Sequence, residues 1–171
     1  QKALTCLTTE DSIKLPPDRI IQHEIELVIL ISRPGEEITS DNAMDYIGGF
    51  ALGLDLTDRK LQKELKERKL PWFLSKSFKN SAVVSSFHEL DLINWSEKFW
   101  LKINGKVVQE GKMDDMEFDI PFLIEFLSSR IPLLAGDIMF TGTPEGVGIV
   151  YKGDVLELGL GASVLKTTRI T

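Results

Sequence analysis

The chain has 171 residues, of which 43% are hydrophobic and 27% are charged, so it is long enough for one domain with a substantial core. The net charge of −6 and the scattered Lys and Arg residues argue against non-specific nucleic-acid binding. Cys6 is the only cysteine, which excludes an internal disulfide and a cysteine-based zinc site and fits a reducing compartment. No apolar run approaches the length needed to cross a membrane.

Residues 20–31 form the most apolar stretch of the chain, yet they contain two carboxylates, Glu24 and Glu26. The Ile and Val content and the flanking prolines predict a β-strand. Side chains two apart on a strand leave the same face, roughly 6–7 Å from each other. Two buried like charges are unfavourable unless something positive neutralises them, and a divalent cation would do so. The alternative is a solvated strand face with two idle carboxylates, and these residues alone favour neither.

A short helix is expected over residues 39–47, with Thr39 or Ser40 as its cap. In this helix Met44 and Ile47 are predicted to point inward.

The clearest amphipathic helix is predicted over residues 58–69, where Leu61 and Leu65 recur at helical spacing and the charged residues form a solvated face. A third helix is expected to begin at Asp119, a capping residue, followed by Pro121 in its first turn.

Short strands separated by turn residues make up much of the remaining chain. Asn104-Gly105 supplies the positive-φ positions of a hairpin over residues 100–111. The other predicted strands cover residues 50–56, 137–142, 146–150 and 154–160. Because the helices do not alternate regularly with strands, this pattern argues against a Rossmann-like sheet. It predicts an α+β fold that is mainly β, in the style of a β-roll.

Asp55 provides a third acidic side chain, at the end of the strand over residues 50–56. A carboxylate at a strand end is held by a rigid element and can face a cavity. Together with Glu24 and Glu26 it would complete an all-oxygen set, which suits Mg²⁺ or Mn²⁺. Read alone, Asp55 is also typical of an acid near a helix start, where the helix dipole favours negative charge.

Three polar residues near this acid have two interpretations each. Lys76 lies among aromatic residues and could meet an anion, but its segment alone favours a lysine at a strand edge with its ammonium group in solvent. Arg59 and Gln62 are one helical turn apart after Asp55, so both could reach the same site. For polar residues on a charged helix, solvent exposure is the simpler expectation.

The segment Gly136–Gly148 is rich in glycine and poor in polar side chains, which indicates a backbone-lined loop that closely approaches something. It has neither the Walker pattern nor the dinucleotide fingerprint. Thr143 could donate its hydroxyl to a substrate carboxylate, although a plain tight turn is the alternative. His23 alternates to the face opposite Glu24, which favours a hydrogen-bonded neighbour over a metal ligand. His88 is predicted to lie in a surface turn, with no role.

The ordered combination of these segments resembles the fumarylacetoacetate hydrolase family, and its acylpyruvase/oxaloacetate decarboxylase branch most closely. The matching segments are HEIEL, MDYIGGFALGLDLTDRKLQ, LPWFLSKSF, ING-KVVQEG and GDIMFTGTPEGVG, which extend over about residues 20–160. The resemblance implies a mixed β-roll of the family's C-terminal domain type, a single catalytic domain over residues 1–171, and a homodimer.

The resemblance also implies a set of site residues. It implies one Mg²⁺ or Mn²⁺ held by Glu24, Glu26 and Asp55. Around the substrate it places Arg59, Gln62 and Thr143 as binding residues and Lys76 as a catalytic residue. The substrate would be a short keto acid such as oxaloacetate or an acylpyruvate, and the cation would stabilise the enolate formed as a C–C bond breaks. Lys76 and Arg59 would supply the extra positive charge that an anionic substrate needs.

The chain departs from the family pattern in three places. The family has an upstream lid segment whose His and Glu activate the hydrolytic water, and no histidine precedes Gln22, so we expect this chain to lack the lid segment. Either the pair lies upstream of Gln1 or the protein does not have it. The glycine that usually follows the metal-strand carboxylates is replaced, since Glu26 leads directly into Leu27. Asp58 stands where a small residue usually precedes the arginine, and it could weaken anion binding or pair with Arg59.

The leading expectation from the sequence is a metal-dependent enzyme that cleaves a C–C bond in short keto acids, by acylpyruvate hydrolysis or oxaloacetate decarboxylation. The alternatives are a keto–enol tautomerase or isomerase on the same fold, and a catalytically silent, metal-stabilised protein. Without the His–Glu pair, hydrolysis should be lost more completely than decarboxylation. The expected location is the cytoplasm, or the mitochondrial matrix in a eukaryote.

Overall fold

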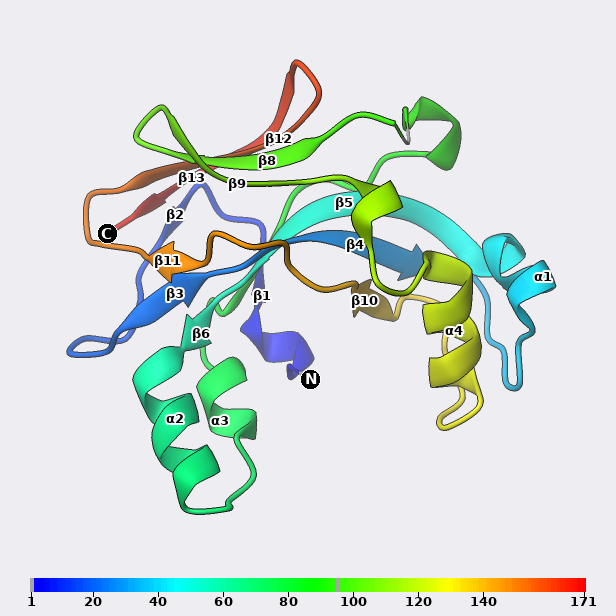
Figure 1. Ribbon diagram of the computed structural model, residues 1–171, viewed down its shortest axis with the longest axis horizontal. Helices are drawn as coiled ribbons and strands as arrows, with labels where there is room; N and C mark the ends of the chain where they lie inside the picture. The colour runs from blue at the N-terminus through cyan, green and yellow to red at the C-terminus, as the bar shows by residue number, and fades with distance from the viewer. Residues whose placement is uncertain (1, 95) are drawn as a thin grey trace.

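The computed structural model describes residues 2–94 and 96–171, and the chain within them forms three small sheets with four short α-helices around them (Figure 1). The central sheet has the order β1 (Leu7–Thr8), β7 (Ala82–Val84), β5 (Ile47–Asp55), β4 (Ile25–Ile31) and β10 (Ile138–Phe140). A three-stranded sheet has the order β11 (Gly148–Ile149), β3 (Ile21–His23) and β6 (Thr57–Asp58). The third sheet has the order β2 (Ser12–Ile13), β13 (Ser163–Ile170), β12 (Val155–Leu160), β8 (Phe99–Ile103) and β9 (Lys106–Gly111).

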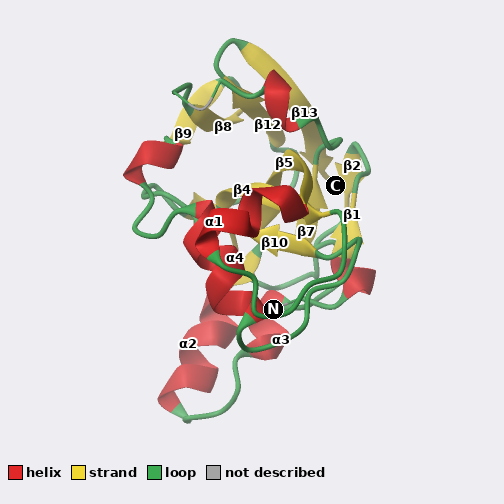
Figure 2. Ribbon diagram, turned by 90° about the vertical axis from the view of Figure 1, so that its right-hand side faces the viewer, coloured by secondary structure: helices red, strands yellow, loops and turns green. Residues whose placement is uncertain are grey.

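Most strand pairs are antiparallel, while β1 with β7 and β2 with β13 are parallel, so the two five-stranded sheets are mixed. The sheet that contains β8 and β12 curls over the central one (Figure 2). Buried Ile and Leu side chains from both five-stranded sheets, such as Leu52 and Leu156, fill the space between them. Removing one such side chain would cost about 2–5 kcal/mol. The predicted α+β, mainly β roll is therefore confirmed.

The helices are α1 (Ser40–Ala43), α2 (Arg59–Glu67), α3 (Phe73–Lys76) and α4 (Ile120–Ser128). Short 3₁₀ turns cover Leu4–Cys6, Met44–Tyr46, Leu90–Leu92 and Met113–Asp115. In the described part of the chain, every helix is too short or too polar to cross a membrane. Helices α2 and α3 lie together at one end of the molecule, whereas α1 and α4 pack against each other at the opposite end (Figure 1).

Two local predictions are confirmed in detail. The hairpin of β8 and β9 turns at Asn104 and Gly105, whose φ angles of 52° and 80° match the expected turn. Helix α4 begins after Asp119, whose carboxylate accepts a hydrogen bond from the backbone N–H of Phe122 at 2.8 Å, with Pro121 in the first turn. In both cases the signal is local, so the neighbouring sequence was sufficient.

The predicted helix over residues 39–47 is only partly correct. Its α-helical part ends at Ala43 and continues as a 3₁₀ turn, and Ile47 already belongs to strand β5. The change of helix type rotates the side chains that follow, so Met44 is 41% exposed and Ala43 is buried instead. The prediction that Met44 points inward is therefore wrong.

The predicted surface turn at His88 is also wrong. The backbone N–H of His88 donates to the carbonyl of Phe50 at 2.8 Å, and the N–H of Phe50 donates back to His88 at 2.9 Å. The two rings lie 5.5 Å apart, and His88 is half-buried. The chain after β7 thus continues along β5 and does not turn into solvent.

Candidate metal centre

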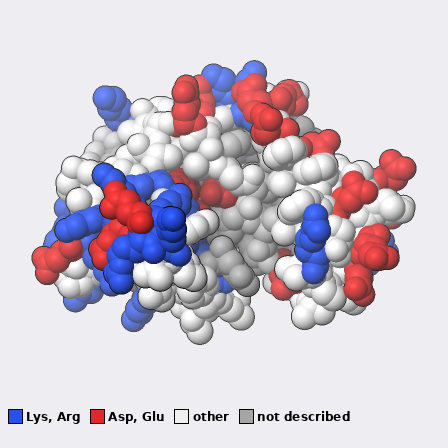
Figure 3. Space-filling view, turned by 60° about the horizontal axis from the view of Figure 1, so that its bottom comes forward, with Lys and Arg blue, Asp and Glu red and all other residues white. Residues whose placement is uncertain are grey.

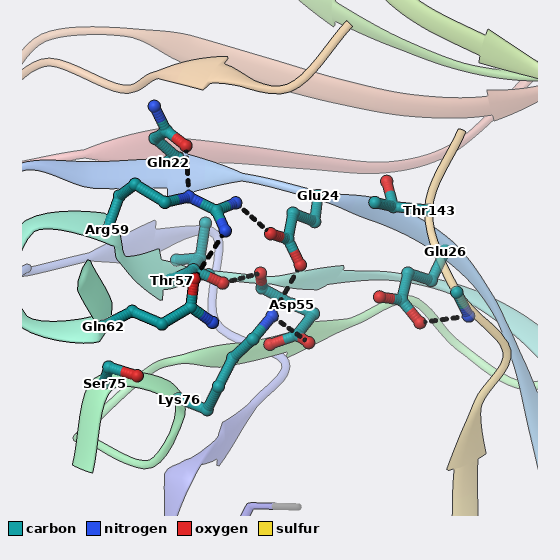
Figure 4. Close-up of polar contacts among 12 residues, drawn as sticks. Gln22, Glu24, Glu26, Asp55, Thr57, Arg59, Gln62, Ser75, Lys76 and Thr143 are labelled. Carbon is teal, nitrogen blue, oxygen red and sulfur yellow. Dashed lines mark hydrogen bonds and ion pairs between the residues drawn. The ribbon is translucent and has the colours of Figure 1, made fainter. Parts of the chain in front are cut away.

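The three carboxylates singled out in the sequence converge at one point of the fold. Glu24, Glu26 and Asp55 each offer an oxygen atom, and these atoms lie within 4.8 Å of one another (Figure 4). Glu24 and Glu26 are buried, with exposed fractions of 6% and 4%. Desolvated carboxylates this close repel one another unless positive charge is present. The all-oxygen donor set therefore fits a hard divalent cation such as Mg²⁺ or Mn²⁺.

The backbone explains why residues far apart in sequence meet here. The predicted strand over residues 20–31 is two strands, because Glu24 lies at the break between β3 and β4. Strands β4 and β5 pair in register, with Ile25 opposite Leu54, and the N–H of Asp55 donates to the carbonyl of Glu24 at 2.8 Å. The end of β5 is thereby fixed beside the break, which brings Asp55 to the two glutamates.

Lys76 lies at the end of α3 and points into the acid cluster. Its ammonium nitrogen is 2.6 Å from Glu24 Oε2 and 2.7 Å from Asp55 Oδ2, and its side chain is only 12% exposed. Burial lowers the pKa of Lys76, but the charges of Asp55 and Glu24 and their hydrogen bonds outweigh it, so the pKa is raised overall. Lys76 is a fixed positive charge here. The expectation of a solvated lysine at a strand edge is wrong.

Arg59 and Gln62 face the same cluster from α2. The Arg59 guanidinium pairs with Glu24, donates to Gln22 Oε1 at 2.6 Å and donates to Gln62 Oε1 at 2.7 Å. Gln62 is 5% exposed and the Arg59 side chain is 35% exposed. The simpler expectation of two solvated residues is wrong, because the face of α2 that carries Arg59 and Gln62 points toward the strand break at Glu24.

A further cation, Lys2, reaches the cluster from the beginning of the chain and was not found from the sequence. Its ammonium nitrogen lies 2.7 Å from Asp55 Oδ1, donates to the carbonyl of Leu56 at 3.0 Å and also donates to the carbonyl of Lys76. Burial lowers the pKa of Lys2, partly offset by Asp55. No local pattern around Lys2 could have signalled a contact with a residue so distant in sequence.

Glu26 has surroundings that differ from those of Glu24. Its carboxylate accepts a hydrogen bond from the backbone N–H of Gly142 at 2.7 Å (Figure 4). Burial, followed by the negative charge of Asp55, raises the pKa of Glu26 to about 7. Glu24 and Asp55 form ion pairs, whereas in the described part of the chain Glu26 has this backbone hydrogen bond and no cationic partner. A divalent cation at this point would compensate its charge.

The glycine-rich loop brings Thr143 near the two glutamates, and its hydroxyl accepts a hydrogen bond from Gln109 Nε2 at 3.0 Å. The Oε1 atom of the same Gln109 side chain lies 2.7 Å from Nδ1 of His23. The expectation that His23 is a hydrogen-bonded neighbour is confirmed. Its pKa is lowered by burial, although Gln109 and the charge of Glu24 oppose this.

Asp58 does not disturb the cluster as the sequence suggested. It is buried, accepts a hydrogen bond from the N–H of Leu61 at 3.0 Å as the cap of α2, and pairs with Arg19 at 3.2 Å. Its charge is therefore neutralised by Arg19 and by the helix start. The expectation that Asp58 could pair with Arg59 is wrong, since Arg59 turns to Glu24.

A cavity of about 520 Å³ lies beside the cluster and shares Gly142 and Thr143 with it. Four of its lining residues are acidic, namely Glu110, Asp115, Glu117 and Glu145. Lys112 also lines the cavity, so its charged lining residues are net negative. By contrast, Lys and Arg side chains gather at the end of the molecule where α2 and α3 lie (Figure 3). The electrostatics favour approach of an anion from the α2 side.

The comparisons with known proteins agree with the fold. The model of the fumarylacetoacetate (FAA) hydrolase C-terminal family matches residues 1–169, so the chain belongs to this family. It is 43% identical over 167 residues to the protein named oxaloacetate tautomerase FAHD1, mitochondrial, of Rattus norvegicus, covering 95% of this chain and 76% of the relative.

Two further relatives bear on the chemistry. The chain is 39% identical over 142 residues to a mitochondrial oxaloacetate decarboxylase of Dictyostelium discoideum, covering 82% of this chain and 65% of that one. The crystal structure of fumarylpyruvate hydrolase from Pseudomonas aeruginosa in complex with Mn²⁺ and pyruvate superposes with a TM-score of 0.90. That protein is 27% identical, and the match covers 99% of this chain and 76% of the other.

Proposed function

We propose that this chain is a divalent-metal-dependent enzyme that forms the enolate of short keto acids of the oxaloacetate type. The observation that carries the proposal is the charge pattern of the site. Three carboxylates, from Glu24, Glu26 and Asp55, are surrounded by three cationic side chains. The three negative and three positive charges balance, so a bound divalent ion would give the site a net charge of about +2. A dicarboxylate keto acid carries the matching negative charge.

The proposal assigns a role to each residue of the cluster. Glu24, Glu26 and Asp55 hold Mg²⁺ or Mn²⁺, and the bound ion supplies a Lewis acid toward the keto oxygen. Lys76, which stays protonated beside two carboxylates, contributes positive charge and a donor proton.

The substrate-binding roles fall to three other side chains. Arg59 and Gln62 bind the substrate's carboxylate from the α2 side, and Thr143 donates its hydroxyl from the glycine-rich loop. This assignment is supported by the convergence of these side chains around Glu24 (Figure 4).

Keto–enol tautomerisation is the reaction that we favour. It moves one proton from the carbon next to the keto group to the keto oxygen, and it breaks no C–C bond. The sequence placed C–C cleavage first, but the names of the FAHD1 relatives from rat and human favour tautomerisation. Decarboxylation of oxaloacetate is the second candidate, because the Dictyostelium relative carries that name. Both reactions share the enolate and need no attacking water.

Hydrolysis of acylpyruvates has the weakest support. It requires a base that activates water, and among the described residues neither histidine is hydrogen-bonded to the carboxylate cluster. His23 bonds to Gln109, and His88 packs on Phe50. We therefore expect hydrolysis to be the slowest of the three reactions.

One assay distinguishes these reactions and the silent-protein alternative. The chain is incubated with Mn²⁺ and either oxaloacetate or acetylpyruvate. The enol is followed by ultraviolet absorbance, carbon dioxide and pyruvate report decarboxylation, and acetate reports hydrolysis. We expect accelerated enol–keto exchange that Glu24→Gln abolishes. Turnover equal in wild type and Glu24→Gln, or absent from both, would contradict the proposal.

The remaining expectations are part of the same proposal. We propose that residues 1–171 act as one catalytic domain and that two chains form a homodimer. A row of exposed aromatic rings on and before α4 supports a protein contact there, formed by Phe118, Phe122 and Phe126. Light scattering should report twice the mass of one chain. The mitochondrial names of the relatives favour the matrix over the cytoplasm as its location.

A further inference from the structure

Gln109 on β9 is a buried residue whose amide makes hydrogen bonds at both ends. Its exposed fraction is 2%. Its Oε1 atom accepts from the backbone N–H of Ile25 at 3.1 Å and lies 2.7 Å from His23 Nδ1. Its Nε2 atom donates to Thr143 Oγ1 and to the carbonyl of Pro144, both at 3.0 Å. The amide is therefore fully occupied and cannot reorient without losing contacts.

Backbone groups fix which end of this amide donates. The N–H of Ile25 can only donate and the carbonyl of Pro144 can only accept, so the oxygen and nitrogen of the Gln109 amide are assigned without ambiguity. Two consequences follow. The proton of the neutral His23 ring lies on Nδ1, facing Oε1. The Thr143 hydroxyl, which accepts from Gln109, keeps its own proton free for another acceptor.

The two contacts of Oε1 flank a proposed metal ligand. His23 is the last residue of β3 and Ile25 is the first of β4, so Gln109 spans the break at which Glu24 lies. The His23 ring is held on its other side by Gly148, where an added Cβ would lie 2.9 Å from Nε2. Gln109 itself belongs to the third sheet. One side chain thus joins the strand break to the glycine-rich loop.

We propose that Gln109 is a positioning residue that sets two parts of the site at once. Through Ile25 and His23 it holds the backbone of Glu24 in place for the cation. Through Thr143 it presents a hydroxyl proton to the substrate's carboxylate. This inference rests on the proposed function, but its effect on Glu24 can be measured without substrate.

Two substitutions separate the two ends of the amide. In its ionised form Gln109→Glu keeps acceptor oxygens toward Ile25 and His23 but has no proton to donate to Thr143. It should raise KM while Mn²⁺ affinity stays close to the wild-type value. Gln109→Leu removes both ends, so Mn²⁺ affinity, measured by calorimetry, should also fall about 10- to 100-fold. If Gln109→Glu fails to fold, Gln109→Leu alone carries both measurements.

The matched control is Thr168→Val, which removes a different buried hydrogen bond. Thr168 is fully buried in β13, and its hydroxyl donates to the carbonyl of Glu10 at 3.1 Å. It should lower thermal stability without changing Mn²⁺ affinity or KM. A Gln109→Leu protein that behaves like Thr168→Val would overturn the inference.

One further readout excludes a purely structural role, and a second tests the orientation of the Gln109 amide. The effects of Gln109→Glu and Thr143→Val on KM should be non-additive, since each breaks the same contact. Nitrogen NMR should place the proton of wild-type His23 on Nδ1. Additive effects, or a proton on Nε2, would contradict the inference. A wild-type protein that turns over no keto acid would contradict the proposed function only, since Mn²⁺ affinity and the His23 tautomer would still decide the role of Gln109.

Discussion

The ammonium group of Lys76 lies 2.6 Å from a carboxylate oxygen of Glu24 and 2.7 Å from one of Asp55, so one lysine joins two of the three proposed metal ligands. Because Glu24 is buried and Lys76 is nearly so, their attraction is only weakly screened by water. The cluster is therefore held together in the ion-free protein, and a cation meets ligands that are already gathered.

Lys76→Met should impair both stability and turnover. The ion-free protein should lose about 2 kcal/mol, less than for an isolated buried pair because Arg59 and Lys2 still contact the two carboxylates. Turnover should fall about 100-fold or more, as expected when a preorganised donor is lost. Urea unfolding with EDTA and steady-state assays with Mn²⁺ measure the two effects. An ion-free Lys76→Met protein as stable as the wild type would refute the argument.

The raised pKa of Glu26 predicts that the stability of the ion-free protein depends on pH. Burial and the charge of Asp55 raise this pKa from 4.5 to about 7. A raised folded-state pKa gives stability that is present below the unfolded value and lost as the pH rises through about 7. Glu26→Gln cannot ionise and should lack this loss. The free energy of unfolding of Glu26→Gln minus that of the wild type should therefore increase by about 2–3 kcal/mol between pH ~5 and pH ~8. A difference that does not vary with pH would contradict this.

Arg59→Lys should affect substrate binding more than the chemical step. Lysine keeps the charge but cannot reproduce the planar set of donors that now contacts Glu24, Gln22 and Gln62. We expect KM for oxaloacetate to rise about 10-fold or more, with a smaller change in kcat. The control is Arg19→Lys, because Arg19 pairs with Asp58 outside the cluster. Equal KM values for the two variants would argue against a binding role for Arg59.

Asp58→Ala tests the reassignment of this residue from the site to the helix start. Loss of the cap of α2 should cost about 1 kcal/mol of stability. Because the carboxylate faces Arg19 and Leu61, KM should stay within twofold of the wild-type value. A marked fall in KM would show that the charge of Asp58 does reach the substrate.

The sequence was informative wherever the physics is local. The turn at Asn104-Gly105 and the helix after Asp119 depend on residues next to each other, and both were predicted. The acidic pair on an apolar stretch also stood out locally. The sequence does not reveal strands that are too short to show a period, such as β1 and β6. It also does not reveal the eight-residue β13, in which buried and exposed positions alternate only near the end.

The contacts of the site were less predictable because they depend on tertiary structure. Lys2 meets Asp55 only because the beginning of the chain runs past the end of β5. The burial of Gln62 depends on how α2 packs, which the charges of that helix do not reveal. Gln109 joins three segments that have no common sequence pattern. Side chains that act through long-range contacts need the fold before they can be assigned.

We propose that Glu24, Glu26 and Asp55 form a metal centre for keto-acid chemistry. The most direct measurement is the rate of enol–keto exchange of oxaloacetate by EDTA-treated protein, before and after Mn²⁺ is added. We predict a rate close to the uncatalysed one before addition and full activity afterward, with no recovery in Glu24→Gln. Equal rates with and without Mn²⁺ would contradict the claim.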